Sequence, residues 1–145
     1  MSVTVEKVQF ATTELLVGLN RLLPQLTSNA EPLTSDDLES MLHSESATLF
    51  VALDGDTVVG TLTLVVFSIP TGRRAWIEDV VVDESSRGVG VGRQLTLSAI
   101  EEARLRGVRT IDLTSRPSRE AANAMYLKLG FERRETNVYR YSLEG

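Results

Sequence analysis

The first half of the chain carries the hydrophobic patterns of β-strands. Residues 3–10 alternate apolar and polar side chains with the period of two that predicts a strand. The apolar runs 47–53 and 57–67 flank an Asp-Gly-Asp turn at 54–56, which is the local signal of a hairpin. We therefore expect an early strand and, after it, an antiparallel pair.

The second half of the chain contains three further strand-like segments. Residues 74–82 end in a run that is apolar on both faces, so this strand should be central and covered on both sides. Residues 108–115 supply the next strand, parallel to 74–82 if the crossover between them takes the usual right-handed form. Residues 131–143 are expected to supply one or two closing strands.

Helical spacing of apolar residues predicts two helices in the first half. The first covers residues 12–23 and should end at Pro24. The second is short and acidic, and it runs from a cap at Thr34 or Ser35 through Leu42.

Two more helices follow the strands of the second half. One repeats an apolar residue at every fourth position from Val91 and stops at Gly107. The other starts near Pro117 or Ser118 and stops at Gly130. This order of elements indicates an α/β protein with a mixed sheet and helices on both faces.

Composition is that of an ordinary globular protein. The chain has 145 residues, of which 42% are hydrophobic and 24% charged, so we expect a single domain over residues 1–145 with a full core. The run 62–67 is far too short to span a bilayer, so we expect no membrane partner. No basic segment followed by an apolar block marks a signal peptide at the N-terminus.

Cysteine is absent, which excludes disulfides, thiolate metal ligands and a cysteine nucleophile. Its absence fits a reducing compartment, and we expect a cytoplasmic protein. The single histidine, His43, cannot anchor a metal site by itself, so no metal is expected.

Charge is distributed unevenly along the chain. The net charge of −5 argues against a nucleic-acid partner. Residues 22–72 contain no Lys or Arg, whereas basic residues slightly outnumber acids from Arg73 onward. The acids of the first segment are Glu31, Asp36, Asp37, Glu39, Glu45, Asp54 and Asp56. The pattern fits either a solvated acidic face or two halves that meet oppositely charged partners.

The segment SSRGVGVGRQL at 85–95 joins the apolar end of a strand to the start of a helix. Unpaired backbone N–H groups and the positive end of the helix dipole make such a junction an anion site. Arg93 stands where the dinucleotide pattern GxGxxG needs a glycine, and the Gly-Lys-Ser/Thr of a P-loop is absent. The pattern that is present is R-x-x-G-x-G at 87–92, followed by Arg93.

This spacing resembles the pyrophosphate-binding signature of the GNAT superfamily of N-acetyltransferases. NAMYLKLGF at 123–131 is similar to a second signature of that family, a helix that bears a tyrosine and ends in Gly-Phe. WIEDVVVDESSRGVGVGRQL, which begins at Trp76, resembles the family's fourth strand and its loop. The resemblance extends from about Arg74 to the C-terminus. It implies a mixed central sheet of six to seven strands, a splay between strands four and five, and about four helices covering both faces.

The resemblance also implies acetyl-CoA as co-substrate. Loop amides and two arginines suit its pyrophosphate, and the backbone of the fourth strand suits its pantetheine amides. A bulge near that strand would turn an N–H toward the thioester carbonyl. The implied cofactor-binding residues are Val80, Val81, Val82, Arg87, Gly88, Val89, Gly90, Val91, Gly92, Arg93 and Asn123.

Transfer to an amine needs a base and profits from an acid. A lysine-like amine has a pKa of about 10.4 and must lose a proton before it attacks. Glu78 is the candidate base, and Asp79 is the alternative because successive strand side chains switch faces. Tyr126 lies where the family has the acid that protonates the leaving thiolate. An ion pair for Glu78 and helix packing for Tyr126 are the competing interpretations.

We therefore expect an acyltransferase that moves acetyl from acetyl-CoA to a primary amine of a small molecule or peptide. Because the chain has no cysteine, no acetyl-cysteine intermediate can form and transfer should be direct. The acidic segment 22–72 favours a cationic amine. The alternatives are a non-catalytic acyl-CoA-binding sensor or partner domain and an amino-sugar-phosphate N-acetyltransferase, for which 22–72 offers no obvious phosphate clamp. The identity of the amine and the oligomeric state stay open, a homodimer included.

Overall fold

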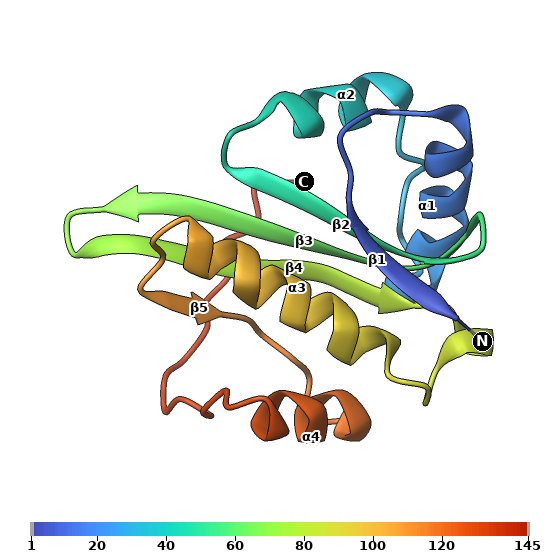
Figure 1. Ribbon diagram of the computed structural model, residues 1–145. Coiled ribbons are helices and arrows are strands. Elements are labelled where there is room, and N and C mark those ends of the chain that lie inside the picture. Colours follow the sequence, from blue (N-terminus) through green and yellow to red (C-terminus); the bar gives the residue numbers. More distant parts are fainter. Residues whose placement is uncertain (1, 145) are drawn as a thin grey trace. The chain divides into compact units, whose positions relative to one another are not determined.

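A computed structural model describes residues 2–144 of the chain (Figure 1). The chain forms two compact units, residues 1–114 and 115–145, and each is described by itself. The first unit holds the whole sheet and three α-helices, and the second unit holds one α-helix, within the described residues.

The sheet has five strands in the order β1-β2-β3-β4-β5. Neighbouring strands from β1 to β4 are antiparallel, and β5 is parallel to β4. The strands are β1 Val3–Lys7, β2 Ala47–Asp54, β3 Thr57–Ile69, β4 Gly72–Val82 and β5 Thr110–Asp112. The hairpin of β2 and β3 and the parallel crossover to β5 confirm the predicted order of elements. The central position predicted for β4 is only partly correct, because β5 pairs with residues 74–76 alone and leaves the apolar tail of β4 without a neighbour on that side among the described residues.

Helices cover both faces of the sheet, as predicted. The helices are α1 Thr13–Leu26, α2 Ser35–His43, α3 Val91–Leu105 and, in the second unit, α4 Glu120–Lys128. One buried cluster joins α1 and α2 to Val51, Val58 and Val81 of β2, β3 and β4. On the opposite face α3 packs against the same strands (Figure 1).

The predicted end of α1 at Pro24 is wrong, because the helix continues to Leu26. A proline inside a helix removes one backbone hydrogen bond and crowds the carbonyl one turn earlier. Here Thr27 N–H still donates to the Leu23 carbonyl at 3.1 Å, which closes the last turn. The side chain of Gln25 is held by hydrogen bonds to residues that follow β4. These contacts outside the helix offset the bond that the proline removes.

The cap of α2 is Thr34, one of the two predicted candidates. Its hydroxyl accepts from the Asp37 N–H at 3.1 Å, and the Asp37 carboxylate accepts from the Thr34 N–H at 3.3 Å. This reciprocal capping box satisfies two N–H groups at the start of the helix. Asp37 therefore has a structural role in addition to its charge.

The start of α3 lies very close to β3. An added Cβ at Gly60 would lie 3.1 Å from both Val91 and Leu95, which is tighter than most real contacts. The predicted four-residue apolar spacing is confirmed, since Val91, Leu95, Ala99 and Ala103 are all buried. The absence of a side chain at position 60 thus lets the first turn of α3 rest on the sheet.

The sheet has five strands and not the six to seven expected. The second unit contains no strand within its described residues, so residues 131–143 do not close the sheet. The apolar side chains of this segment are largely exposed: Val138 by 72%, Tyr139 by 88%, Tyr141 by 89% and Leu143 by 93%. An alternating pattern confers strand propensity, but a strand also needs a backbone partner and a buried face. Among the described residues of the second unit, residues 131–143 have no partner strand, and most of their apolar side chains are exposed.

None of the helices within residues 2–144 combines the length and the apolar character that a membrane crossing requires.

Candidate active site

Strand β4 carries a bulge in its second half. Thr61 of β3 pairs with Val81 and Thr63 pairs with Glu78, so two β4 residues oppose one β3 residue. The first of those two, Asp79, has a φ of 51°, in the left-handed region that Asp enters more readily than most side chains. The bulge implied by the family resemblance is therefore present.

Strands β4 and β5 separate beyond the first few residues of their ladder. Pairing runs only from Arg74 with Thr110 to Trp76 with Asp112. Within residues 2–144, no strand pairs with 77–82 on that side of β4. This splay leaves backbone N–H and C=O groups of β4 available to an extended ligand.

The three valines expected to bind the cofactor lie along this free edge. Val81 is buried in the core beneath α1 and α2, whereas Val80 and Val82 are half-buried. Their side chains belong largely to the sheet, so any ligand contact at Val81 would be made by its backbone.

Glu78 lies on the face of the sheet that α1 and α2 cover. Directly paired residues point to one side of a sheet, and Glu78 pairs with Thr63 while Val81 pairs with Thr61, two positions away on β3. Val81 contacts the α1–α2 cluster, so Glu78 shares its face. Glu78 and Asp79 are both exposed, and neither takes part in an ion pair within residues 2–144.

Gly88 and Gly90, in the glycine loop between β4 and α3, are exposed. Gly88 has a φ of 83° and Gly90 a φ of 87°, a region that favours glycine, and an added Cβ at either would meet no atom within 4 Å. Gly90 is the N-cap of α3 and offers no side chain to the N–H groups of the first turn. These N–H groups have no side-chain cap and lie at the positive end of the helix dipole, as an anion site requires.

The other loop residues expected at the cofactor differ in their surroundings. Arg87 and Arg93 are exposed, and Arg87 Nε donates to the Val82 carbonyl at 3.0 Å. Val89 is exposed, whereas Val91 is buried under α3 and can offer only its backbone. Gly92, in the first turn of α3, is half-buried.

The buried carboxylate of Asp83, beside the loop, was not predicted from the sequence. Asp83 follows β4 directly and accepts hydrogen bonds from Gln25 Nε2 at 2.8 Å, from Arg21 Nη1 at 3.2 Å and from the Ser85 hydroxyl. The hydrogen bonds from Gln25 and Ser85 and the charge of Arg21 hold the pKa of Asp83 below its ordinary value, although burial opposes them. No local signal could reveal this cluster, because Gln25 and Arg21 precede Asp83 by 58 and 62 residues.

The second unit carries the two expected site residues of α4. Asn123 and Tyr126 are three positions apart and so lie on one helix face. The Tyr126 ring packs edge-on against Phe131, with centroids 5.6 Å apart. Burial raises the pKa of Tyr126 and the charge of Arg119 opposes this rise, so the phenol is protonated at neutral pH. Asn123 Nδ2 donates to the Arg116 carbonyl at 2.9 Å, which holds the turn before the helix.

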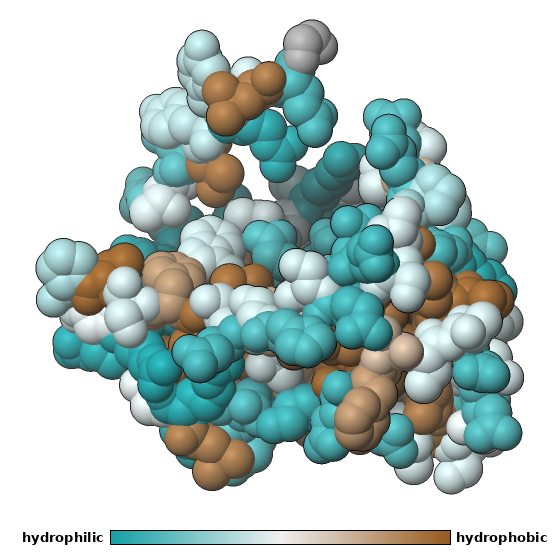
Figure 2. All heavy atoms as spheres, turned by 90° about the horizontal axis from the view of Figure 1, so that it is seen from above, coloured by the Kyte–Doolittle hydropathy of each residue, from teal (hydrophilic) through white to brown (hydrophobic). Residues whose placement is uncertain are grey.

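The acids of residues 22–72 lie mainly at the surface of the first unit. All are exposed except Asp54, which is half-buried. Figure 2 looks down on the side that carries α1 and α2 at the top of Figure 1, where hydrophilic side chains are interspersed with neutral and hydrophobic ones.

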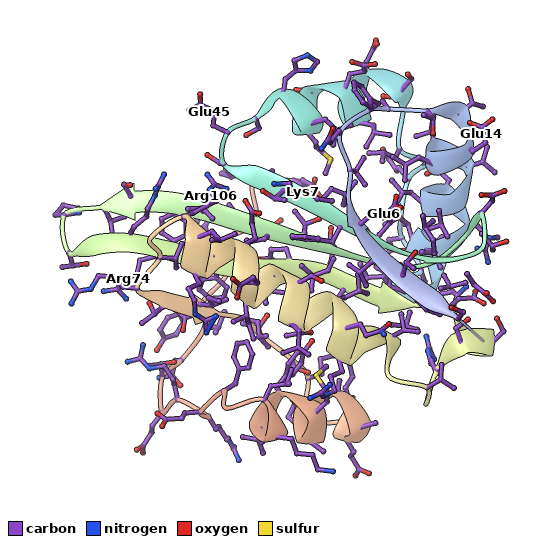
Figure 3. All side chains as sticks on the ribbon, in the orientation of Figure 1. Glu6, Lys7, Glu14, Glu45, Arg74 and Arg106 are labelled. Carbon is purple, nitrogen blue, oxygen red and sulfur yellow. The ribbon has the colours of Figure 1, made fainter. Side chains whose placement is uncertain are left out.

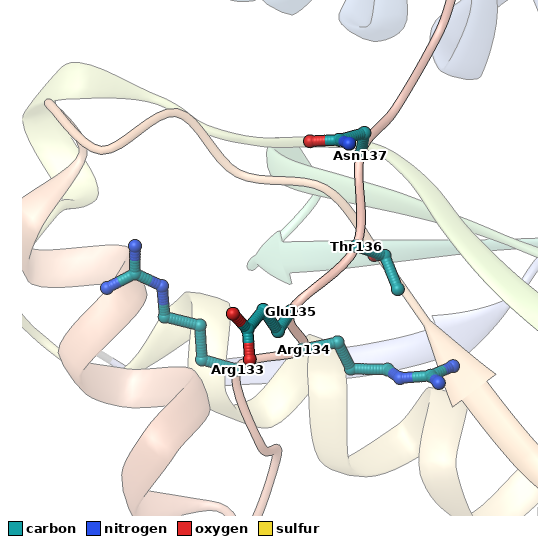
Figure 4. A pocket seen from close by; sticks show the side chains of 5 residues that line it. All are labelled: Arg133, Arg134, Glu135, Thr136 and Asn137. Carbon is teal, nitrogen blue, oxygen red and sulfur yellow. The ribbon is translucent and has the colours of Figure 1, made fainter.

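Two other features lie outside this site. In the second unit, residues 133–137 line a shallow hollow along an exposed segment, with Arg133 and Arg134 extending in opposite directions (Figure 4). It contains none of the expected site residues. Within residues 2–144, no three His, Asp or Glu side chains gather closely enough to hold a metal ion.

A splayed α/β sheet with a bulged fourth strand and a glycine loop at a helix N-terminus defines an acetyltransferase-type fold. The family described as "Acetyltransferase (GNAT) family" matches residues 17–131, and the chain belongs to it.

Named relatives accompany this family match. A mycothiol acetyltransferase of Amycolatopsis mediterranei is 46% identical over 59 residues, which are 41% of this chain and 20% of that protein. An L-2,4-diaminobutyric acid acetyltransferase of Shouchella clausii is 36% identical over 84 residues, which are 57% of this chain and 46% of that protein. The chain thus spans less than half the length of these curated relatives.

A solved structure shares the fold across nearly the whole chain. The aminoglycoside acetyltransferase meta-AAC0020 from an uncultured soil metagenomic sample superposes with a TM-score of 0.87 and 20% identity, covering 98% of this chain and 97% of that one. At this identity the likeness concerns the fold alone.

Proposed function

We propose that this protein transfers an acetyl group directly from acetyl-CoA to a primary amine, and that the acceptor is a cationic small molecule or peptide. The observation that carries the proposal is the free, bulged edge of β4, which runs into the glycine loop at the start of α3. This arrangement offers backbone groups to two chemically different parts of one ligand. We further propose that residues 1–145 act as a single domain.

The free edge and the loop suit acetyl-CoA for separate reasons. The open amides of the loop, with Arg87 and Arg93, would bind the pyrophosphate, because a Cβ at Gly88 or Gly90 would hold its oxygens away. The backbone of 80–82 would pair with the pantetheine amides as an added strand does. Asn123 would contact the cofactor arm from α4.

Glu78 is the proposed base. Deprotonating an amine of pKa about 10.4 at pH 7 costs about 4.6 kcal/mol, so a carboxylate that takes the proton lowers the barrier. Glu78 is exposed, stands beside the bulge and lies on the α1–α2 face of the sheet. Asp79 stays the alternative, since it is equally exposed within the bulge.

Tyr126 is the proposed acid. The amine nitrogen forms a bond to the acetyl carbon while the carbon–sulfur bond breaks and the electron pair leaves on sulfur. The ammonium loses two protons in the overall reaction. One passes through Glu78 to solvent, and the other equals the proton that the departing thiolate gains to become a thiol. Tyr126 would supply that thiol proton and then be reprotonated, and its raised pKa keeps it in the protonated form that donates.

The charge of the acceptor follows from the acidic segment. Residues 22–72 include α2 and carry exposed acids without a Lys or Arg, so their field favours an approaching cation and disfavours a phosphate. L-2,4-diaminobutyric acid, for which one relative is named, carries two amines and one carboxyl group and is therefore a cation at neutral pH.

The test is an acetyl-CoA turnover assay across amines of different charge. We expect the highest kcat/KM for cationic amines, such as polyamines, diamino acids, aminoglycosides or lysine-ended peptides, and a fall as salt screens the field. Asp36→Asn with Glu39→Gln should reproduce that fall without salt. Asp37 is left intact because it caps α2.

The outcomes separate the alternatives. Preference for an amino-sugar phosphate, or rates indifferent to salt and to the two substitutions, would contradict a cationic acceptor. Tight acetyl-CoA binding without turnover on any amine would instead support an acyl-CoA-binding sensor or partner domain. Absence of acetyl-CoA binding would overturn the proposal.

A further inference from the structure

A polar cluster holds the base of the glycine loop from the side of α1. We call Arg21, Gln25 and Asp83 the loop clamp. The Asp83 carboxylate accepts from Gln25 Nε2 at 2.8 Å and from Arg21 Nη1 at 3.2 Å. Gln25 Oε1 in turn accepts from the Glu84 N–H at 3.0 Å. One glutamine therefore binds the side chain of the first loop residue and the backbone of the second.

The clamp also fastens the loop to β3. Asp83 N–H donates to the Val59 carbonyl at 2.8 Å, and Arg21 Nη2 donates to the Val58 carbonyl. The start of the loop is thus bound to two elements that are far apart in the sequence. Its position depends on side chains that come from α1.

The loop has a fixed base and an open tip. Ser86 is buried and its N–H donates to the Asp83 carbonyl at 2.9 Å, whereas Gly88 and Gly90 have no atom within 4 Å of an added Cβ. Arg87 Nε bonds to the Val82 carbonyl at one end of the tip and α3 begins at the other, so the direction of the N–H groups between them also depends on how the base of the loop is held.

We propose that the loop clamp positions the loop amides for the pyrophosphate of acetyl-CoA and so determines cofactor affinity without contacting the reacting atoms. This inference rests on the proposed function. The attraction between half-exposed Arg21 and the Asp83 carboxylate adds little to fold stability by itself, since desolvation offsets much of it and the hydrogen bonds from Gln25 and Ser85 contribute more to holding the carboxylate ionised. Its location at the base of the open loop favours a positioning role.

Gln25→Glu tests the clamp at constant size. The substitution removes the Nε2 donor and places a second carboxylate beside that of Asp83, so the two repel each other. One oxygen of the new side chain can still accept from the Glu84 N–H. We expect Kd and KM for acetyl-CoA to rise about tenfold, because a displaced loop base would weaken a charge-assisted hydrogen bond between the loop amides and the pyrophosphate. The kcat at saturating acetyl-CoA and the KM for the amine should stay within about twofold, because the reacting groups are unchanged.

Exchanging the two groups should restore binding. In Gln25→Glu combined with Asp83→Asn, the carboxylate and the amide swap sides, so a hydrogen bond between them forms again with donor and acceptor reversed. We expect calorimetric acetyl-CoA affinity to return to within about threefold of the wild type, a recovery that defines coupling between the two positions. Gln25→Met, which keeps the length of the side chain without its hydrogen bonds, replaces Gln25→Glu if that variant does not fold.

The Lys7–Glu102 ion pair between β1 and α3 is a matched control (Figure 3 labels Lys7). The N···O distance is 3.2 Å in both this pair and the Arg21–Asp83 pair. The side-chain exposures are also similar, 46% for Lys7 and 18% for Glu102 against 44% for Arg21 and 13% for Asp83. Glu102→Gln should leave acetyl-CoA affinity unchanged.

Three results would overturn the inference. In the first, Gln25→Glu lowers thermal stability and kcat but leaves acetyl-CoA affinity unchanged. In the second, the exchange variant binds no better than the single variants. In the third, Glu102→Gln weakens binding as much as Gln25→Glu does. A wild-type protein that binds no acetyl-CoA would overturn the proposed function together with this inference, whereas wild-type binding with unaffected clamp variants overturns the clamp alone.

Discussion

Replacing Gly90 by alanine can separate the effect of backbone strain on stability from the effect of the added Cβ on acetyl-CoA binding. Gly90 has a φ of 87° and Gly107, just after α3, has a φ of 72°, and an added Cβ at either meets no atom within 4 Å. Alanine in this left-handed region costs about 1–2 kcal/mol, so Gly90→Ala and Gly107→Ala should be destabilised alike. At about 3–4 °C per kcal/mol for a chain of this size, both should lose about 3–8 °C in Tm.

Only Gly90→Ala should weaken acetyl-CoA binding. Its Cβ would project into the open space beside the first turn of α3 and hold the pyrophosphate oxygens away from the loop N–H groups. A hydrogen bond to a charged group contributes about 1.5–3 kcal/mol, so the loss of one raises Kd about 10- to 150-fold.

The assay is calorimetric titration of acetyl-CoA into both variants well below their Tm, with thermal unfolding measured on the same samples. Gly107→Ala should bind like the wild type despite its lower Tm. Equal affinities for the two alanine variants would show that the loop amides do not approach the ligand, and the pyrophosphate assignment would then fail.

Three further predictions concern the catalytic groups and the buried carboxylate. Tyr126→Phe should lower kcat by up to about 100-fold and leave acetyl-CoA affinity unchanged. As a control, Tyr139→Phe at an exposed position should not change kcat. An unaffected kcat in Tyr126→Phe would make Tyr126 a packing residue. The defect of Glu78→Gln should shrink as pH rises, because more of the amine is then already deprotonated, and a pH–rate profile showing equal loss at every pH would make Glu78 structural. Asp83 has a lowered pKa, so its carboxylate stabilises the fold above the unfolded value of about 3.9 and loses that effect as pH falls through the lower folded value. Urea unfolding of wild type and Asp83→Asn should therefore differ at pH 7 and converge as the pH falls below the lowered pKa of Asp83, and a gap that does not narrow in acid would refute this linkage.

Elements with local signals could be predicted from the sequence. The Asp-Gly turn, the cap at Thr34 and the four-residue spacing from Val91 each depend on neighbours in the chain, and each prediction agrees with the structure. Several predicted bounds are too long, since the first strand ends at Lys7, the fifth covers only Thr110–Asp112 and the last helix begins at Glu120. Two larger errors concern positions decided by distant contacts. Gln25 bonds to residues after β4 and so allows α1 to continue past Pro24. Residues 131–143 have strand-like alternation but form no strand within the described part of the second unit.

The candidate site divides in the same way. The glycine loop and the strand before it could be recognised because their spacing is local, and the resemblance correctly implied the bulge and the splay. The loop clamp could not be recognised, because Arg21, Gln25 and Asp83 are ordinary residue types that meet only in the fold. The Thr34-x-x-Asp37 spacing is a local signal of a capping box, so the structural role of Asp37 could have been predicted in addition to its charge.

The unpaired edge of β4 has a consequence for solubility. A row of free N–H and C=O groups is a template for a strand of another molecule, and proteins protect such edges with bulges and charged side chains. Strand β4 carries both a bulge and charged side chains within its unpaired segment 77–82, since exposed Glu78 and Asp79 lie at the shift in register. The acids considered for proton transfer therefore also discourage edge-to-edge aggregation, and a bound pantetheine arm would cover the same groups. Concentrated protein should accordingly scatter more light without acetyl-CoA than when it is saturated with it.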